Sequence, residues 1–426
     1  MNETIKPLKG TLQIPGDKSI SHRAIMCGAL AKGKTEIYNF LRGEDCLSTI
    51  SCFENLGVNI FEKDDCIYVR GNGLHGLKRP NQMLYTGNSG TTTRLITGIL
   101  AGQSFSSIVS GDSSIRKRPM NRIIHPLSLM NADIKCQKKD GYVPFSIHGK
   151  PLQGISYKTN VASAQVKSSI LYAGLYASDK TSVIEPATSR NHTELMLTSF
   201  GAKIELPNKN ETTIYPCNEL FAQRINVPGD ISSAAYFIAA ALIIPNSEIK
   251  LLNVGINSTR AGMLQVLEAM GANITYENEK IIAGEKIADL IVKHSNLKGT
   301  VIEGDIIPTL IDEIPILAVL AAFAKGKTYI KDAEELKVKE SNRIQSIEMN
   351  LKNMGASITS TEDGFLIEGG KFLHSSNIKT FMDHRIAMSF YVALLAIGEN
   401  NIFLLDFPSC VSISYPEFFE SFSKLI

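Results

Sequence analysis

Cations in three short polar runs could bind anionic substrates. Lys18, Ser19 and Arg23 lie in the run GDKSISHR, Arg118 lies in RKRP, and Arg190 opens an R-x-H-x-E run. Guanidinium and ammonium groups donate charge-assisted hydrogen bonds to phosphate and carboxylate. Each run taken alone also fits a solvated basic surface, so its meaning depends on where the runs lie in the fold.

Two further runs, NSGTTTR and SAQVK, are small and polar. A glycine in such a run lets the backbone approach a ligand closely, and the free N–H groups at a helix start bind anions. Each run alone is also typical of a plain capping loop. The candidate binding residues in these runs are Asn88, Gly90, Thr91, Ser163, Ala164 and Gln165.

Carboxylates in the second half of the chain are candidates for proton transfer. Asp312 and Glu313 precede the apolar stretch IPILAVLAAFA, and Glu340 lies three residues before Arg343 in KVKESNR. General acid–base catalysis needs a carboxyl group of this kind beside the reacting atoms. The alternatives are a helix cap at Asp312 and a surface ion pair between Glu340 and Arg343. A carboxylate beside several cations has a lowered pKa, which opposes an acid role for Glu340.

The elements that position these residues recur along the chain. A polar opening, an apolar helix and a turn into a strand appear six times, at intervals of roughly 70 residues. Between them lie helices that end in Gly or Asn, at positions 57, 131, 201, 271 and 355, followed by strands and hairpins such as the one at Asp363–Gly364. The six openings lie at Lys18, Asn88, Ser163, Asp230, Asp312 and Asp383.

Placement at equivalent points of successive repeats links the polar runs. Helices as apolar as AAYFIAAALII have no solvent face, so three parallel copies per domain should be buried, with their amino ends on one surface. We therefore expect a cleft that holds two carboxylates, Asp312 and Glu340, and six cations. Those cations are Lys18, Arg23, Arg118, Arg190, Arg343 and Arg385.

The repeat count predicts a mixed α/β fold of two domains with three βαβαββ-type repeats each. Pro-Gly-Asp occurs at residues 15–17 and again at 228–230, both just before a buried helix. We interpret these tripeptides as the crossovers between domains. The prediction is one domain of residues 1–15 plus 228–426 and a second of residues 16–227.

Composition excludes several classes of protein. The 426 residues carry 44 basic and 42 acidic side chains, so no net field recruits nucleic acid or an anionic membrane. The seven scattered cysteines form no C-x-x-C pair, which argues against a disulfide framework or a zinc site and favours a reducing cytoplasm. The longest apolar stretch, residues 234–244, is too short to span a bilayer.

Seven motifs together resemble the 3-phosphoshikimate 1-carboxyvinyltransferase (EPSP synthase) family over essentially the whole chain. They are GDKSISHR, GNSGTTTR, RKRP, SAQVK, IDE, VKESNR and DHRIAM. The resemblance implies a two-domain inverse-helix barrel and transfer of the enolpyruvyl group of phosphoenolpyruvate to the 5-hydroxyl of shikimate 3-phosphate. It implies no metal or organic cofactor, and glyphosate as an inhibitor. We also expect a monomer.

The resemblance assigns roles to individual residues. Lys18, Asp312 and Glu340 would be catalytic, with Glu340 protonating C3 of phosphoenolpyruvate and either Asp312 or Lys18 taking the hydroxyl proton. Residues implied for shikimate 3-phosphate are Lys18, Ser19, Arg23, Ser163, Arg190, Asp312 and Lys339. Residues implied for phosphoenolpyruvate are Lys18, Gly90, Arg118, Gln165, Arg343 and Arg385.

Three features refine the resemblance and leave two alternatives open. SAQVK, the run at Arg190 and NSTR at Asn257 are similar to class II members, whereas SISYPEFF has Ile413 and Ser414 where many members carry Lys. The sister transferase acting on UDP-N-acetylglucosamine carries a Cys or Asp in a mobile loop and begins its first helix with K-N, whereas GDSSIRKRP has no Cys and the start is K-S. A decayed sugar-phosphate-binding protein is disfavoured because Asp312 and Glu340 are both retained.

Overall fold

The six apolar stretches form helices in the computed structural model of the protein, which describes residues 5–426. Each helix begins at or within two residues of its predicted opening, which confirms the helical part of the repeat. All residues of Ile231–Leu242 and of His384–Ala396 are buried, as expected for helices without a polar face. The six are α1 (Lys18–Leu30), α3 (Gly90–Ala101), α5 (Ala164–Gly174), α7 (Ile231–Ile243), α10 (Ile314–Phe323) and α12 (His384–Ala396).

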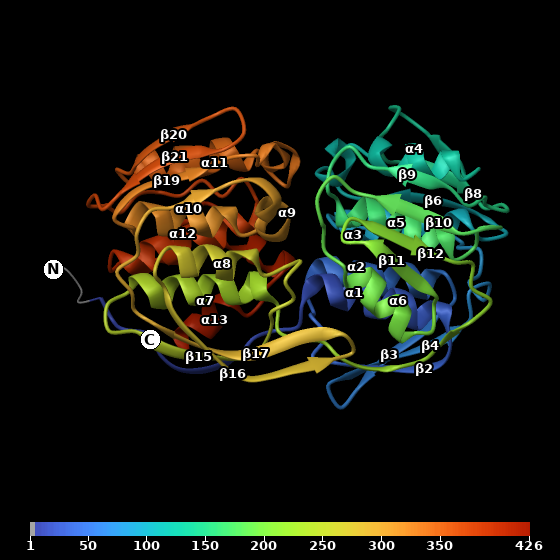
Figure 1. Ribbon diagram of the computed structural model, residues 1–426, viewed down its shortest axis with the longest axis horizontal. Coiled ribbons are helices and arrows are strands. Elements are labelled where there is room, and N and C mark those ends of the chain that lie inside the picture. The colour runs from blue at the N-terminus through green and yellow to red at the C-terminus, as the bar shows by residue number, and fades with distance from the viewer. Residues whose placement is uncertain (1–4) are drawn as a thin grey trace. The chain divides into compact units, whose positions relative to one another are not determined.

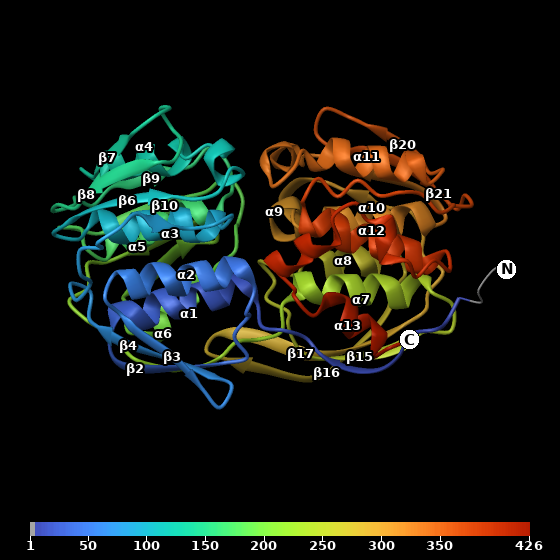
Figure 2. The ribbon, with the colours of Figure 1, turned by 180° about the vertical axis from the view of Figure 1, so that it is seen from behind.

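The chain divides into two units, shown from two sides in Figures 1 and 2. Unit 1 contains the chain up to Asp17, Pro228–Ile281 and Lys286–Ile426. Unit 2 contains Lys18–Val227 and Ile282–Glu285. The chain therefore passes from unit 1 into unit 2 after Asp17, returns after Val227, and enters unit 2 once more for the four residues Ile282–Glu285.

Unit 2 has three sheets with one strand order. Counted by position in the sheet, the first two strands are parallel neighbours, the third is antiparallel to the second, and the fourth is antiparallel to the third. The strands are β13 (Leu220–Phe221) and β14 (Arg224–Asn226) with β2 (Ala31–Tyr38), β3 (Asn59–Lys63) and β4 (Cys66–Asn72); β5 (Leu84–Tyr85), β6 (Ser106–Ser110), β7 (Asp133–Cys136) and β8 (Phe145–His148); and β9 (Ser156–Lys158), β10 (Thr181–Ile184), β11 (Ile204–Asn208) and β12 (Glu211–Ile214).

Helices fill and cover unit 2. The buried α3 contacts both α1 and α5, so the apolar helices form the core that the sheets enclose. A further helix follows each second strand and contributes buried side chains to the same core. These helices are α2 (Glu44–Asn55), α4 (Asn121–Leu129) and α6 (His192–Ser199), with the short turn η1 (Ile115–Lys117) before α4.

Unit 1 repeats the arrangement around α7, α10 and α12, which contact one another pairwise. Its two sheets keep the same strand order, and β1, from the start of the chain, supplies the first strand parallel to β15. The strands are β1 (Lys9–Gln13), β15 (Glu248–Gly255), β16 (Asn273–Ile282) and β17 (Glu285–Lys293); and β18 (Val301–Ile302), β19 (Gly326–Ile330), β20 (Ser357–Ser360) and β21 (Phe365–Gly369). The other helices are α8 (Gly262–Ala269), η2 (Gly304–Ile306), α9 (Ile307–Leu310), η3 (Glu334–Val338) and α11 (Arg343–Asn353).

The sixth repeat departs from the prediction. The strand expected after α12 is absent from this part of the described chain, which forms the 3₁₀ turns η4 (Ile402–Leu404) and η5 (Pro408–Ile413) and then α13 (Phe418–Ser423). The side-chain oxygen of Asn401 accepts the N–H of Phe403 at 3.0 Å, so a local turn bond replaces a ladder bond. A single parallel bridge between Ile378 and Leu405 is what remains of the expected pairing.

The predicted helix stops are confirmed by the backbone. Gly57, Asn131, Gly201, Gly271 and Gly355 have positive φ angles, between 73° and 102°. Left-handed backbone just after the last turn ends a helix, and Gly or Asn adopts it at least cost. The five interleaved helices therefore end where the sequence indicates.

Three further properties concern the chain as a whole. All seven cysteines are free thiols, and burial raises the pKa of Cys27 and of Cys52 to about 12. Across residues 5–426, no single helix is long and apolar enough to cross a membrane. The segments Gly304–Leu310 and Ile314–Phe323, which meet at a bend of 110°, have together the length and composition of a membrane span. No group of three or more His, Cys, Asp or Glu side chains in those residues could hold a metal ion.

Candidate active site

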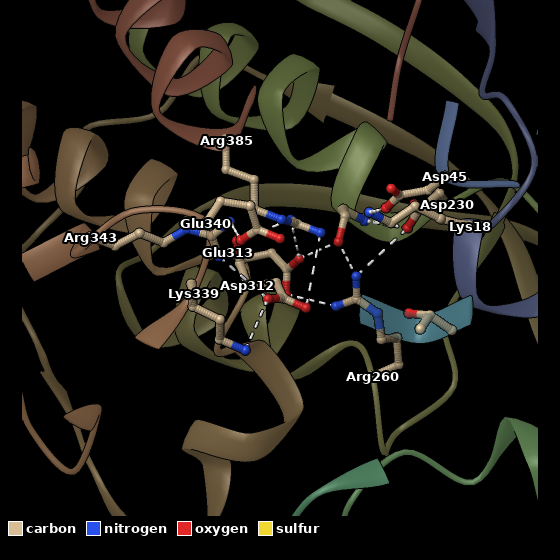
Figure 3. A network of polar contacts seen from close by, with 12 residues as sticks. Lys18, Asp45, Asp230, Arg260, Asp312, Glu313, Lys339, Glu340, Arg343 and Arg385 are labelled. Atoms are coloured by element: carbon tan, nitrogen blue, oxygen red, sulfur yellow. Dashed lines mark hydrogen bonds and ion pairs between the residues drawn. The ribbon is translucent and has the colours of Figure 1, made fainter. Parts of the chain in front are cut away.

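In unit 1 the amino ends of the three buried helices meet at one buried carboxylate, that of Glu313 (Figure 3). Glu313 is the N-cap residue of α10, and its Oε1 accepts a short hydrogen bond from the Ser232 hydroxyl in the first turn of α7. The Nη1 of Arg385, from the first turn of α12, lies 3.4 Å from the same oxygen and donates to the carbonyl oxygen of Asp312 at 3.0 Å. The predicted convergence of amino ends is therefore present within this unit.

Arg343 joins α11 to the start of α12. Its Nε donates to Asp383 Oδ2 at 2.9 Å, and its Nη2 donates to Asp383 Oδ1 at 3.2 Å and to Glu340 at 2.6 Å. Asp383 also caps α12 by accepting the N–H of Arg385 at 3.0 Å. Arg343 is 1% exposed, so the surface ion pair considered for Glu340 and Arg343 is wrong: the pair lies at a buried guanidinium.

Asp312 lies among three cations: Arg343 and Arg385 from the predicted six, and Lys339, which the family resemblance implies as a substrate-binding residue. Its carboxylate oxygens are 3.5 Å from Lys339 Nζ, 3.5 Å from Arg343 Nη1 and 3.9 Å from Arg385 Nη2. The helix α10 takes Glu313 as its N-cap residue, so the capping alternative for Asp312 is also wrong. Asp312 and Lys339 remain partly exposed, at 16% and 20% of their side chains, which leaves both accessible to a ligand.

Arg260 completes the network and was not among the predicted site residues. Its Nη1 donates to Glu313 Oε2 at 2.7 Å, and its Nη2 makes a short hydrogen bond with Ser232 and lies 3.7 Å from Asp230. Burial disfavours a cation here, yet Glu313 and Asp230 raise the pKa of Arg260 above its ordinary value. Burial and the neighbouring Asp17 raise the pKa of Asp230. The only sequence signal for Arg260 was its place at the end of NSTR.

In unit 2 the start of α1 presents Lys18 and Arg23. Lys18 forms an ion pair with Asp45 at 3.0 Å, a partner that sequence reasoning missed. Arg23 is buried: its Nε donates to Thr193 at 2.6 Å, and its Nη2 donates to Ser168 at 2.9 Å. Three elements, α1, α5 and α6, therefore hold this guanidinium in one orientation.

The start of α3 gathers a second set of predicted residues. Arg118 Nη2 donates to the side-chain oxygen of Asn88 at 2.5 Å, and Gln165 Nε2 donates to the Thr91 hydroxyl at 3.1 Å. A methyl group added to Gly90 would lie 3.3 Å from Arg118 Nη1. Arg118 is buried while its neighbours Arg116 and Lys117 are exposed, so the RKRP run is a solvated loop with one inward arginine.

A buried ion triad supports the start of α5. Lys167 Nζ lies 2.8 Å from Glu185 and 2.8 Å from Glu194, and all three side chains are at most 5% exposed. Glu185 also accepts the N–H of Ser163 at 3.1 Å, which fixes the backbone at the first residue of SAQVK. The sequence marked SAQVK, which contains Lys167, and the R-x-H-x-E run, which contains Glu194, but it did not indicate the ion pair between them.

The remaining predicted residues of unit 2 are partly buried. Ser19, Ala164 and Arg190 are neither fully exposed nor fully buried. His192, to which no catalytic role was assigned, lies 2.6 Å from Glu285 through Nδ1. Of the six predicted cations, Arg343 and Arg385 belong to unit 1 and the other four to unit 2.

Comparison with known proteins identifies the class of this fold. The enolpyruvyl transferase NikO from Streptomyces tendae aligns with a TM-score of 0.78 over 99% of this chain and 95% of its own, at 16% identity, which shows a shared fold. EPSP synthase from Acinetobacter baumannii aligns with a TM-score of 0.87 and 44% identity, over 99% and 96% of the two chains. The fold is that of the enolpyruvyl transferases.

Sequence comparison then gives the family. The model of the family EPSP synthase (3-phosphoshikimate 1-carboxyvinyltransferase) matches residues 2–422. A 3-phosphoshikimate 1-carboxyvinyltransferase from Thermoanaerobacter sp. (strain X514) is 55% identical over 98% of both chains, and one from Oceanobacillus iheyensis is 49% identical over 98% of this chain and 97% of its own. The chain belongs to the EPSP synthase family, whose members use shikimate 3-phosphate and phosphoenolpyruvate. This membership favours that activity over the UDP-N-acetylglucosamine alternative.

Proposed function

We propose that the polar residues described above bind the two substrates of this family and catalyse enolpyruvyl transfer. Arg343 carries the proposal. Its Nη1 is buried and has no hydrogen-bond partner within the described residues, while its Nη2 holds Glu340 at 2.6 Å. One guanidinium therefore offers a donor to a ligand oxygen and also positions a carboxyl group beside that ligand.

Phosphoenolpyruvate carries a carboxylate and a phosphate, which suit forked cationic donors. We assign its binding to Arg343, to Arg385 and to residues at the starts of α1, α3 and α5. Support comes from Arg118, which is buried and held by Asn88, so that its orientation is set before a ligand arrives. The unit 2 residues assigned to phosphoenolpyruvate are Lys18, Gly90, Arg118 and Gln165, with Asn88 and Thr91 beside them.

Shikimate 3-phosphate requires donors for a phosphate and an acceptor for a hydroxyl group. We assign its phosphate side to Ser19, Arg23, Ser163 and Arg190, with Ala164 beside them, and its ring hydroxyls to Lys18, Asp312 and Lys339. Support comes from the fixed guanidinium of Arg23 and from the carboxylate of Asp312, which lies 3.5 Å from Lys339. A carboxylate held this way can accept a hydroxyl proton.

The chemistry that follows consists of proton transfers around an addition and an elimination. Glu340 donates a proton to C3 of phosphoenolpyruvate while the 5-hydroxyl oxygen of shikimate 3-phosphate bonds to C2. The hydroxyl proton passes to Asp312 or to Lys18. A tetrahedral intermediate forms, its C2–O bond to phosphate breaks, and a C3 proton returns to the Glu340 carboxylate as the double bond is restored. Cationic groups already in place would stabilise the charge that develops on the departing phosphate.

Substrate choice tests this proposal directly. We expect release of inorganic phosphate from phosphoenolpyruvate when shikimate 3-phosphate is the acceptor. We expect none with UDP-N-acetylglucosamine, because the predicted residues match the first acceptor. The measurement is phosphate release with each acceptor at equal concentration. Release only with UDP-N-acetylglucosamine would reverse the assignment, and release with neither would favour the binding-protein alternative.

Glyphosate inhibition is a further part of the proposal. We expect inhibition competitive with phosphoenolpyruvate, and we expect Gly90→Ala to raise the inhibition constant more than it raises KM. The added methyl would lie 3.0 Å from Arg94 Nη1 and 3.3 Å from Arg118 Nη1, so it would press on two guanidinium groups and crowd the longer inhibitor more than the shorter substrate. Inhibition series for wild type and Gly90→Ala, at saturating shikimate 3-phosphate, give both constants. Equal changes in the two would contradict this steric explanation.

The biological setting completes the proposal. We assign the two units to the two predicted domains, because the chain changes unit after Asp17 and again after Val227, beside the two Pro-Gly-Asp tripeptides. We also propose that the enzyme is a monomer. Seven free thiols support a cytoplasmic setting, where cysteines stay reduced.

A further inference from the structure

Arg260 is buried in unit 1, and its side chain contacts the starts of two helices, α7 and α10. Its side chain is 3% exposed. Nη1 donates to Glu313 at the start of α10, while Nη2 contacts Ser232 in the first turn of α7 and lies 3.7 Å from Asp230. A planar guanidinium suits these divergent acceptors, because its N–H donors point in fixed directions within one plane.

Glu313 connects Arg260 to the proposed substrate site. The Glu313 side chain is 1% exposed, and its two oxygens face two different arginines: Oε2 lies 2.7 Å from Arg260, and Oε1 lies 3.4 Å from Arg385. Arg385 also approaches Asp312 at 3.9 Å. Asp312 also has Lys339 and Arg343 at 3.5 Å, whereas among the described contacts the only cation that Glu313 would keep, if Arg260 were lost, is the Arg385 guanidinium at 3.4 Å.

From this arrangement we propose that Arg260 is a positioning residue for phosphoenolpyruvate binding. Arg260 neutralises Glu313, so the Arg385 guanidinium keeps its orientation and its charge can pair with the anionic substrate. A buried carboxylate that loses its cation attracts the neighbouring cation more strongly, because a buried charge without a counter-charge has a high free energy. The inference rests on the proposed role of Arg385 and adds a residue that does not itself contact substrate.

A purely structural role for Arg260 makes a different prediction. If Arg260 only tied α7 to α10, its loss would lower stability and reduce the active fraction, and KM for phosphoenolpyruvate would stay unchanged. If it balances Glu313, its loss would raise that KM, and removing the charge of Glu313 as well would restore it. The charge of Glu313 therefore separates the two roles.

The experiment compares Arg260→Met, Glu313→Gln and the double variant by steady-state kinetics at saturating shikimate 3-phosphate. We expect Arg260→Met to raise KM for phosphoenolpyruvate about tenfold or more, as expected when a buried charge is left unpaired beside a binding cation. We expect kcat to change less. The double variant should recover most of the loss, because it buries no unpaired carboxylate, and Arg260→Lys should lie between wild type and Arg260→Met.

Controls separate this inference from the proposed function. Lys250→Met removes another cation of unit 1, paired with Glu277 at 2.8 Å on the sheet, and should leave KM unchanged. Arg385→Ala should raise KM for phosphoenolpyruvate; an unchanged value would overturn the role of Arg385 itself. If Arg385→Ala raises KM while Arg260→Met does not, or while the double variant shows no recovery, the inference about Arg260 alone is wrong. Should Arg260→Met not fold, the double variant and Arg260→Lys give the same comparison.

Discussion

Glu340→Gln and Asp312→Asn are each expected to lower kcat by about a hundredfold or more while the protein stays folded. Both replacements keep the shape of the side chain and remove its ability to exchange a proton. Glu340 is held at 2.6 Å by Arg343, and Asp312 lies within 4 Å of Lys339, Arg343 and Arg385. The amides can still accept hydrogen bonds from these groups, so the main loss should be in the chemical step and not in KM.

The measurement is kcat from steady-state phosphate release, with the unfolding midpoint of each variant as a check on folding. Glu335→Gln is a matched control, because Glu335 lies 3.8 Å from Lys339 on the same segment and is 34% exposed. It should turn over at the wild-type rate. Wild-type turnover in folded Glu340→Gln would remove Glu340 from the mechanism, and the same result for Asp312→Asn would leave Lys18 as the group that takes the hydroxyl proton.

The local features of the fold could be predicted because their causes lie in neighbouring residues. A polar opening followed by an unbroken apolar stretch predicted α7 and α12, whose cap residues Asp230 and Asp383 accept the backbone N–H two residues on. A Gly after the last turn predicted the stops at Gly57 and Gly355, where φ is positive. Neither inference needs information about distant parts of the chain.

Strand partnership could not be predicted in the same way. The β1 strand pairs with β15, with Lys9 opposite Glu248, and no local pattern marks this partner over the strands nearer in sequence. In the sixth repeat a strand was predicted that the described chain does not form. The apolar residues after Gly398 resemble a strand, yet the Asn401 side chain bonds to the N–H of Phe403 and turns the chain. The hydrogen bond of the Asn401 side chain therefore favours a turn where the hydrophobic pattern predicted a strand.

The candidate site was predictable in its residue types and not in its pairings. Cations such as Lys18 and Arg343 were found because anion binding needs them, but their buried partners, Asp45 and Asp383, are 27 and 40 residues away. Arg260 was missed for the same reason, since its contacts with Ser232 and Glu313 exist only once α7 and α10 pack together. Ion pairing inside a core is a product of tertiary packing.

Lys167 illustrates how much such a pairing contributes. Burial lowers the pKa of Lys167, but Glu194 and Glu185 more than offset this and raise the pKa above its ordinary value. The raised folded-state pKa means that the contribution of Lys167 to stability is complete below its unfolded-state pKa of about 10.4 and is lost only as pH rises through the folded value. Its effect on stability should therefore be the same at pH 7 and pH 9.

Lys167→Met is expected to lower the free energy of unfolding by about 3–5 kcal/mol, because it leaves two carboxylates buried without their cation. Urea unfolding of wild type and variant at pH 7 measures the loss. Lys203→Met is a matched control, since Lys203 forms an exposed pair with Glu205 at 3.1 Å and should change stability by less than about 1 kcal/mol. Adding Glu185→Gln and Glu194→Gln to Lys167→Met should restore much of the loss, because the uncompensated charges are then gone. A loss that persists in the triple variant would show that Lys167 stabilises unit 2 through the packing of its methylene chain and not through its charge.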